Sequence, residues 1–158
     1  MLGISPFGMV HTVISLVAVA AGVVAFVRFK EISPRTAVGK TYVWMTILTC
    51  LTGFFIFHHG GFGPAHALGI ITLVVLGVAW AAGKGKFGGA SRYVETICYT
   101  MTFFFHMIPT IMEGLTRLPA GHPVAATQQD PLITKLIGVA FVLFLAGAAL
   151  QLVRLRRK

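Results

Sequence analysis

Long apolar runs separated by short charged stretches are the feature that most constrains the fold of this chain. Of its 158 residues, 56% are hydrophobic and 11% are charged, whereas soluble domains usually carry about 25% charged residues. A helix needs about 20 consecutive apolar residues to cross a hydrocarbon core roughly 30 Å thick. The pattern therefore predicts an all-α integral membrane protein.

Five such runs predict a bundle of five transmembrane helices that forms one domain over residues 1–158. The expected spans are residues 6–27, 38–58, 64–82, 93–115 and 132–153. The first run is not typical of a cleavable signal peptide, because no positive charge precedes it and Arg28 follows it where small residues would stand. We expect the spans to pack as one helical unit, since backbone groups in lipid have to bond within their own segment.

The positive charges predict how the bundle is oriented. Two of them, Arg117 and Lys135, fall on one side of the predicted membrane, and eleven fall on the other: Arg28, Lys30, Arg35, Lys40, Lys84, Lys86, Arg92, Arg154, Arg156, Arg157 and Lys158. Cytoplasmic loops carry an excess of Lys and Arg. The N-terminus is therefore expected outside and the C-terminus in the cytoplasm.

The formal net charge of +9 does not indicate a nucleic-acid-binding protein. Nearly every Lys and Arg stands at the end of an apolar run, so no basic face remains to follow a phosphate backbone. The expected partner is the lipid bilayer. Membrane protein subunits are the further partners that this pattern leaves open.

With this topology, all six histidines fall in the external half of the protein: His11, His58, His59, His66, His106 and His122. Neutral imidazole is the commonest metal ligand, and a carboxylate can complete a mixed shell around Zn, Cu or Fe. The sequence therefore predicts a transition-metal site near the periplasmic face, formed by His11, His59, His66, His106 and Glu113.

A single b-type haem is the other cofactor that these histidines could hold. Such a haem needs two opposed imidazoles from different helices, and His11 with His106 is the predicted pair. Either centre favours a redox or electron-transfer function, and whether the protein is an enzyme stays open. No HExxH, CxxC or His-x3-His spacing is present, so the site is inferred from topology.

Polar residues also form a stripe along the fourth predicted span. At about 100° per residue they cover roughly 80° of one helix face; they are Glu95, Tyr99, Thr102, His106, Thr110 and Glu113. Ionisable groups at this depth are costly unless they face the protein interior, a cavity or a partner. The stripe is therefore expected to point inward, and a proton or small-solute path along it is an alternative function.

A structural interpretation of the same residues is also open. His58, His59 and His66 can be interfacial residues at the level of the headgroups, and the polar stripe can hold neighbouring helices together. The protein would then be a non-enzymatic helical subunit of a larger membrane assembly.

Two segments carry a family resemblance. Residues 35–44, Arg-Thr-Ala-Val-Gly-Lys-Thr-Tyr-Val-Trp, follow an "arginine, basic, glycine, basic, tyrosine" pattern, without the histidine that usually precedes the glycine, and residues 60–80 contain Gly-Gly, Leu-Gly and a final Trp. Together they resemble a bacterial family of predicted inner-membrane proteins that carries only a domain-of-unknown-function label. The resemblance implies a small multi-pass protein of the bacterial inner membrane, without an established activity or cofactor.

Overall fold

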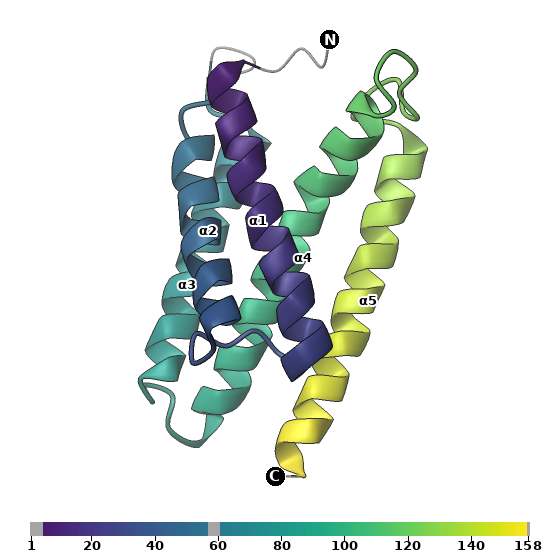
Figure 1. Cartoon of the computed structure of the whole chain (residues 1–158). Helices are drawn as coiled ribbons and strands as arrows, with labels where there is room; N and C mark the ends of the chain where they lie inside the picture. Colours follow the sequence, from purple (N-terminus) through teal and green to yellow (C-terminus); the bar gives the residue numbers. More distant parts are fainter. Residues whose placement is uncertain (1–4, 57–60, 158) are drawn as a thin grey trace.

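The computed structural model describes residues 5–56 and 61–157, and this part of the chain contains helices and no strands. Five α-helices form an up-and-down bundle (Figure 1). They are α1 (Pro6–Phe29), α2 (Ala37–Gly53), α3 (Pro64–Gly83), α4 (Ser91–Arg117) and α5 (Pro131–Arg156), and the short 3-10 helix η1 (Gly88–Ala90) precedes α4. The all-α prediction is confirmed.

Successive helices run in opposite directions, which gives the bundle two ends. The upper end in Figure 1 holds the starts of α1 and α3 and the loop 118–130. The lower end holds the connections 30–36 and 84–90 and the end of α5. The start of α1 and the end of α5 therefore lie at opposite ends of the bundle.

Three of the five helices, α1, α3 and α5, are long and apolar enough to cross a membrane. The sequence predicts five apolar spans, and three of the five helices agree with that prediction. α2 has 17 residues, which is at the lower limit for a span. α4 has 27 residues and is long enough to cross a membrane. It is less apolar than the other three because it carries Arg92, Glu95, His106 and Glu113. A membrane protein with several spans is consistent with this pattern.

Capping residues explain where the helices begin. The Thr36 side chain accepts a hydrogen bond from the backbone N–H of Gly39 at 3.0 Å and starts α2. Asp130 accepts one from the N–H of Leu132 at 2.8 Å and starts α5, with Pro131 in its first turn. Both residue types satisfy N–H groups that have no partner within the helix.

α2 ends at Gly53 rather than at residue 58, so the predicted second span is too long. The chain turns at Phe54 and Phe55, and glycine is a poor helix former. A Cβ atom at Gly53 would lie 3.3 Å from Cε1 of His11. The end of α2 therefore packs closely against α1 before the chain leaves the helix.

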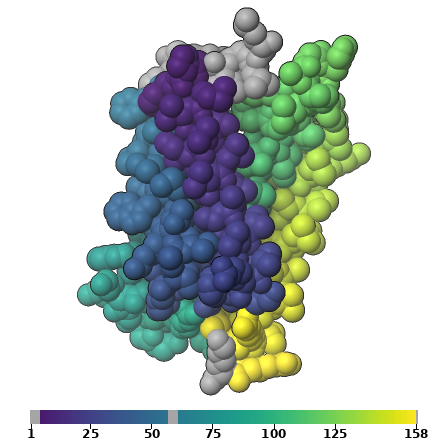
Figure 2. All heavy atoms as spheres, in the orientation of Figure 1, coloured from purple at the N-terminus to yellow at the C-terminus, as the bar shows by residue number. Residues whose placement is uncertain are grey.

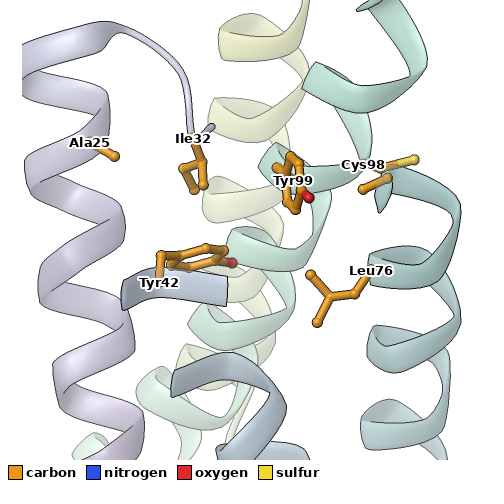
Figure 3. Close-up of a cluster of buried hydrophobic side chains, with 7 residues drawn as sticks. Ala25, Ile32, Tyr42, Leu76, Cys98 and Tyr99 are labelled. Carbon is orange, nitrogen blue, oxygen red and sulfur yellow. The ribbon is translucent and has the colours of Figure 1, made fainter. Parts of the chain in front are cut away.

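The buried apolar core lies between the first four helices and the connection after α1. It contains Ala25, Ile32, Tyr42, Leu76, Ala79, Cys98 and Tyr99. Figure 3 shows the two tyrosine rings pointing into this cluster from different helices. No residue of α5 belongs to it.

α5 lies along one side of the bundle, where Figure 2 shows it as the yellow-green edge. Its contact with α4 is largely aromatic: the Phe104 and Phe144 rings stack with centroids 5.7 Å apart. Of its most apolar stretch of 18 residues, only 11% is buried inside the bundle. Most of its side chains therefore face outward, where a lipid bilayer is the matching environment.

Candidate functional site

The polar stripe of α4 points into the bundle over most of its length. Glu95, Tyr99, Thr102 and His106 are buried, as the sequence predicts, whereas Thr110 is exposed and Glu113 is partly exposed. At about 1.5 Å per residue, Glu95 and Glu113 lie about 27 Å apart along the helix. The stripe therefore extends over nearly the thickness of a hydrocarbon core.

Two side-chain hydrogen bonds connect the middle of this stripe to α2. The Tyr42 hydroxyl lies 2.8 Å from Oγ1 of Thr102, and Oγ1 of Thr46 lies 3.0 Å from Nε2 of His106. All four side chains are buried, three of them completely. We call Tyr42, Thr46, Thr102 and His106 the mid-bundle cluster.

The mid-bundle cluster consists of two neighbouring hydrogen-bonded pairs of groups that can both donate and accept protons. The Thr102 hydroxyl donates to the carbonyl of Tyr99 at 2.8 Å, so the Tyr42 hydroxyl must donate to Thr102. Tyr42 and Thr46 are one turn apart on the same face of α2. The Tyr42 and His106 rings meet edge to face with centroids 6.0 Å apart. Hydroxyl and imidazole groups in such pairs can exchange protons.

A second cluster of polar side chains lies at the lower end of the bundle and consists of charged residues. Glu95 pairs with Arg35 at 2.9 Å and with Arg92 at 3.0 Å, and Arg92 also pairs with Glu31 at 2.5 Å. The Glu95 side chain is 4% exposed and the Arg35 side chain is 56% exposed. We call Glu31, Arg35, Arg92 and Glu95 the lower ion-pair network. Its two acids and two bases compensate each other, which a buried carboxylate requires.

Two glycines allow this network to form. A Cβ atom at Gly39 would lie 1.9 Å from the backbone oxygen of Ser33, and one at Gly83 would lie 3.1 Å from Oε1 of Glu95. Ser33 in turn accepts a hydrogen bond from the Arg35 guanidinium at 3.2 Å. Three residues of the 35–44 segment thus have defined structural roles: Arg35 pairs with Glu95, Gly39 permits close packing, and Tyr42 joins α4.

The remaining described site residues lie toward the upper end. Nδ1 of His11 is 2.9 Å from Oγ1 of Thr52. His66 is buried in the first turn of α3, where its Nδ1 accepts from the backbone N–H of Gly63 at 3.1 Å. Glu113 forms an ion pair with Arg117. His122 is exposed in the loop 118–130.

Among the described residues, the predicted metal ligands are not found as one centre. Within residues 5–56 and 61–157, no group of three or more His, Cys, Asp or Glu side chains could hold a metal ion. His11, His66, His106 and Glu113 are therefore not brought together as a first shell, because each binds a different neighbour. His59, the fifth predicted ligand, lies outside the described residues, as does His58.

One ring nitrogen of each histidine in the predicted haem pair is hydrogen-bonded to a threonine of α2. His106 binds Thr46 through Nε2, and His11 binds Thr52 through Nδ1. Haem ligation through these two atoms would require both hydrogen bonds to break. The two threonines lie about 9 Å apart along α2 at the helical rise per residue.

Sequence reasoning missed the partners on α2 and in the first connection. Tyr42 and Thr46 are four residues apart, the same spacing as Thr102 and His106. Two matching polar pairs in neighbouring apolar runs could have indicated that α2 and α4 face each other. No comparable signal connects Arg35 with Glu95.

Comparisons with protein-family models, with curated proteins and with solved structures found no match to this chain. The resemblance of residues 35–44 and 60–80 to the bacterial inner-membrane family stays a prediction. The contacts described above therefore have to carry any functional conclusion.

Proposed function

We propose that this chain is a five-span protein of the bacterial inner membrane that conducts protons along the buried polar face of α4. The observation that carries this proposal is the mid-bundle cluster, two buried pairs of hydroxyl and imidazole groups between α2 and α4. A packed helical interface needs only small apolar residues. Two neighbouring pairs of proton-exchanging groups at this depth favour a transport function.

The same contacts support α2 and α4 as spans, although neither is among the three most apolar helices. A polar face is tolerated within a bilayer when it points toward the protein interior. Thr46 and Tyr42 of α2 cover the polar face of α4 in the middle of the bundle. The polar groups of each helix are therefore hidden from lipid by the other.

The charge distribution supports the proposed orientation. Of the described Lys and Arg residues, Arg117 and Lys135 lie at the upper end, and ten lie at the lower end: Arg28, Lys30, Arg35, Lys40, Lys84, Lys86, Arg92, Arg154, Arg156 and Arg157. The lower end is therefore proposed to face the cytoplasm. In this proposed orientation the N-terminus lies outside.

The proposed path has a contact with water near each end. At the lower end, Glu95 is buried but its partner Arg35 is half exposed. Tyr99 lies one turn above Glu95, and its backbone carbonyl accepts a hydrogen bond from Thr102 of the mid-bundle cluster at 2.8 Å. Above His106 the stripe continues to Glu113, whose side chain is 41% exposed. Protons would enter and leave at the two carboxylates and pass the middle through neutral groups.

Proton flux through the purified full chain in liposomes tests this function. A pH-sensitive dye is enclosed in the liposomes, a pH gradient is imposed, and valinomycin with potassium removes the opposing potential. We expect the wild type to dissipate the gradient faster than protein-free liposomes. His106→Phe should reduce the rate to the protein-free level, because phenylalanine fills the site without a group that accepts a proton.

The matched control is His122→Gln, which removes an exposed histidine from the loop 118–130 and should leave the rate unchanged. Elution from a size-exclusion column and helical circular dichroism show whether each variant is folded. A wild type no faster than protein-free liposomes, or a folded His106→Phe variant as fast as wild type, contradicts the proposal.

The redox function is the second candidate, and one observation favours it. His11 and His106 come from different helices and both contact the upper half of α2, so small side-chain movements could turn them toward a shared ligand. An absorption spectrum and a metal analysis of the purified protein test this candidate. A Soret band that is lost in both His11→Gln and His106→Gln supports haem, whereas a colourless sample without stoichiometric metal rejects the redox function.

A further inference from the structure

A cavity of about 560 Å³ lies between α1, α4 and α5, on the side of α4 where α5 packs. Ligand sites typically have volumes of about 300–1,000 Å³. Most of the wall is apolar and aromatic, including Phe26, Phe103, Phe104, Met107, Leu143 and Phe144. The buried wall therefore fits a hydrocarbon chain and offers little to a polar solute.

The lower end of the same cavity is polar and positively charged. Lys30, Gln151 and Arg154 line it there. Gln151 holds the wall in place, since it accepts a hydrogen bond from Thr100 at 2.8 Å and donates one to the carbonyl of Lys30 at 2.9 Å. Lys30 and Arg154 are both exposed at the surface, which places their cationic groups where a lipid headgroup lies.

Neither cation has an acidic partner in the described part of the chain. The ion pairs found there all involve Glu31, Glu95 or Glu113 with Arg35, Arg92 or Arg117. Lys30 donates instead to the carbonyl of Val27 at 3.0 Å, and Arg154 lies 3.5 Å from the carbonyl of Phe29. Two cations that contact only carbonyl oxygens leave room for an anion at this end.

We propose that this cavity is a binding site for one anionic phospholipid. An acyl chain lies in the apolar part, and the phosphate binds Lys30 and Arg154. Basic pockets between transmembrane helices are a recognised way of binding anionic headgroups. From Ala140 to Arg154 the cavity follows α5 for about 21 Å, which is enough for an acyl chain that fills one leaflet of about 15 Å. With the proposed orientation this is the cytoplasmic leaflet, whereas the binding site itself does not depend on that orientation.

Native mass spectrometry of the full chain in detergent micelles tests the site with palmitoyl-oleoyl phosphatidylglycerol and with the neutral phosphatidylcholine of the same acyl chains. We expect one phosphatidylglycerol per chain and much less phosphatidylcholine. The double variant Lys30→Gln with Arg154→Gln should bind phosphatidylglycerol about 30-fold more weakly. This corresponds to about 1 kcal/mol for each cation near an anionic lipid, at 1.4 kcal/mol for a tenfold change.

The matched charge control is Lys84→Gln with Lys86→Gln, which removes two positive charges from the lower end but away from the cavity. It should bind like wild type. A second pair of variants tests the acyl chain separately. A Cβ atom would meet nothing within 4 Å at either Gly147, which lines the cavity, or Gly138, which does not. Gly147→Leu should exclude the lipid, and Gly138→Leu should retain it.

Three outcomes would overturn the proposal. Equal binding of phosphatidylcholine would mean that the cations do not select the lipid. Wild-type binding by Gly147→Leu would mean that the chain does not enter the cavity. A lipid-free dimer would mean that a second copy of the protein covers this face.

Discussion

The lower ion-pair network and the mid-bundle cluster both attach α4 to its neighbours, but by different chemistry. The lower network uses full charges that compensate one another, and its arginines reach the surface. The mid-bundle cluster has no carboxylate or guanidinium group, and all four of its side chains are buried. The cost of removing a charge from water explains the difference, since it is highest at the centre of a bilayer. Charge therefore appears in this bundle where water is near, and neutral hydrogen bonds replace it where water is not.

Removal of both arginines from the lower network should have the largest effect. Arg35→Ala with Arg92→Ala leaves the carboxylate of Glu95 buried without a cation. Breaking a buried ion pair from one side typically costs about 3–5 kcal/mol, and we expect a loss of this size in the free energy of unfolding. Unfolding by added dodecyl sulfate in mixed micelles, followed by circular dichroism, measures it.

Glu95→Gln added to the same variant is the internal control. It removes the uncompensated charge, so most of the lost stability should return. Arg117→Ala is the less buried counterpart, because the Arg117 and Glu113 side chains are 28% and 41% exposed, and it should change stability by about 1 kcal/mol. If Glu95→Gln restores nothing, the charge of Glu95 is not what the arginines stabilise.

Gly39→Ala should have the next largest effect, because it displaces the connection that carries Arg35. The new Cβ atom would lie 1.9 Å from the Ser33 carbonyl oxygen, so the backbone has to move. Overpacking of this kind costs about 1–3 kcal/mol. Gly77→Ala is the matched control, since its Cβ atom would meet nothing within 4 Å, and it should be neutral or slightly stabilising. Equal stability of the two variants would show that the contact with Ser33 relaxes freely.

Tyr42→Phe should have the smallest effect on stability and so gives the sharpest contrast between the two regions. The Thr102 hydroxyl keeps its hydrogen bond to the carbonyl of Tyr99, so no donor is left without an acceptor. Interhelical hydrogen bonds in membrane proteins contribute about 0.6 kcal/mol on average, and we expect a loss of that order. Proton flux in liposomes should nevertheless fall, because one of the two hydrogen-bonded pairs is lost.

Tyr93→Phe, at the start of α4, should change neither stability nor flux. A large loss of stability in Tyr42→Phe without any change in flux would assign the mid-bundle cluster a structural role only.

The fold was predictable where apolar runs and turn residues dominate. The start of α3 at Pro64 and the lengths of α1 and α5 follow from hydropathy and from Pro and charged residues at the ends. The end of α2 was not predictable in this way. The apolar residues after Gly53 continue the hydropathy of the helix, although the backbone turns at Phe54 and Phe55.

The sequence predicts one part of the candidate site and not the other. The inward direction of the α4 stripe follows from helical periodicity and from the cost of burying Glu95 and His106. The partner of each histidine could not be predicted in this way. Two imidazoles at a similar depth can face each other, or each can face a different threonine. His11 and His106 were assigned to one centre on depth, and the structure places each against its own hydroxyl group on α2.

The outlying position of α5 has a consequence for biosynthesis. The ion pairs of the described residues and the mid-bundle cluster all lie between Glu31 and Arg117. Chains fold from the N-terminus while they are still being made, so these bonds can all form before α5 leaves the ribosome. The last helix can then join helices that these bonds already hold together.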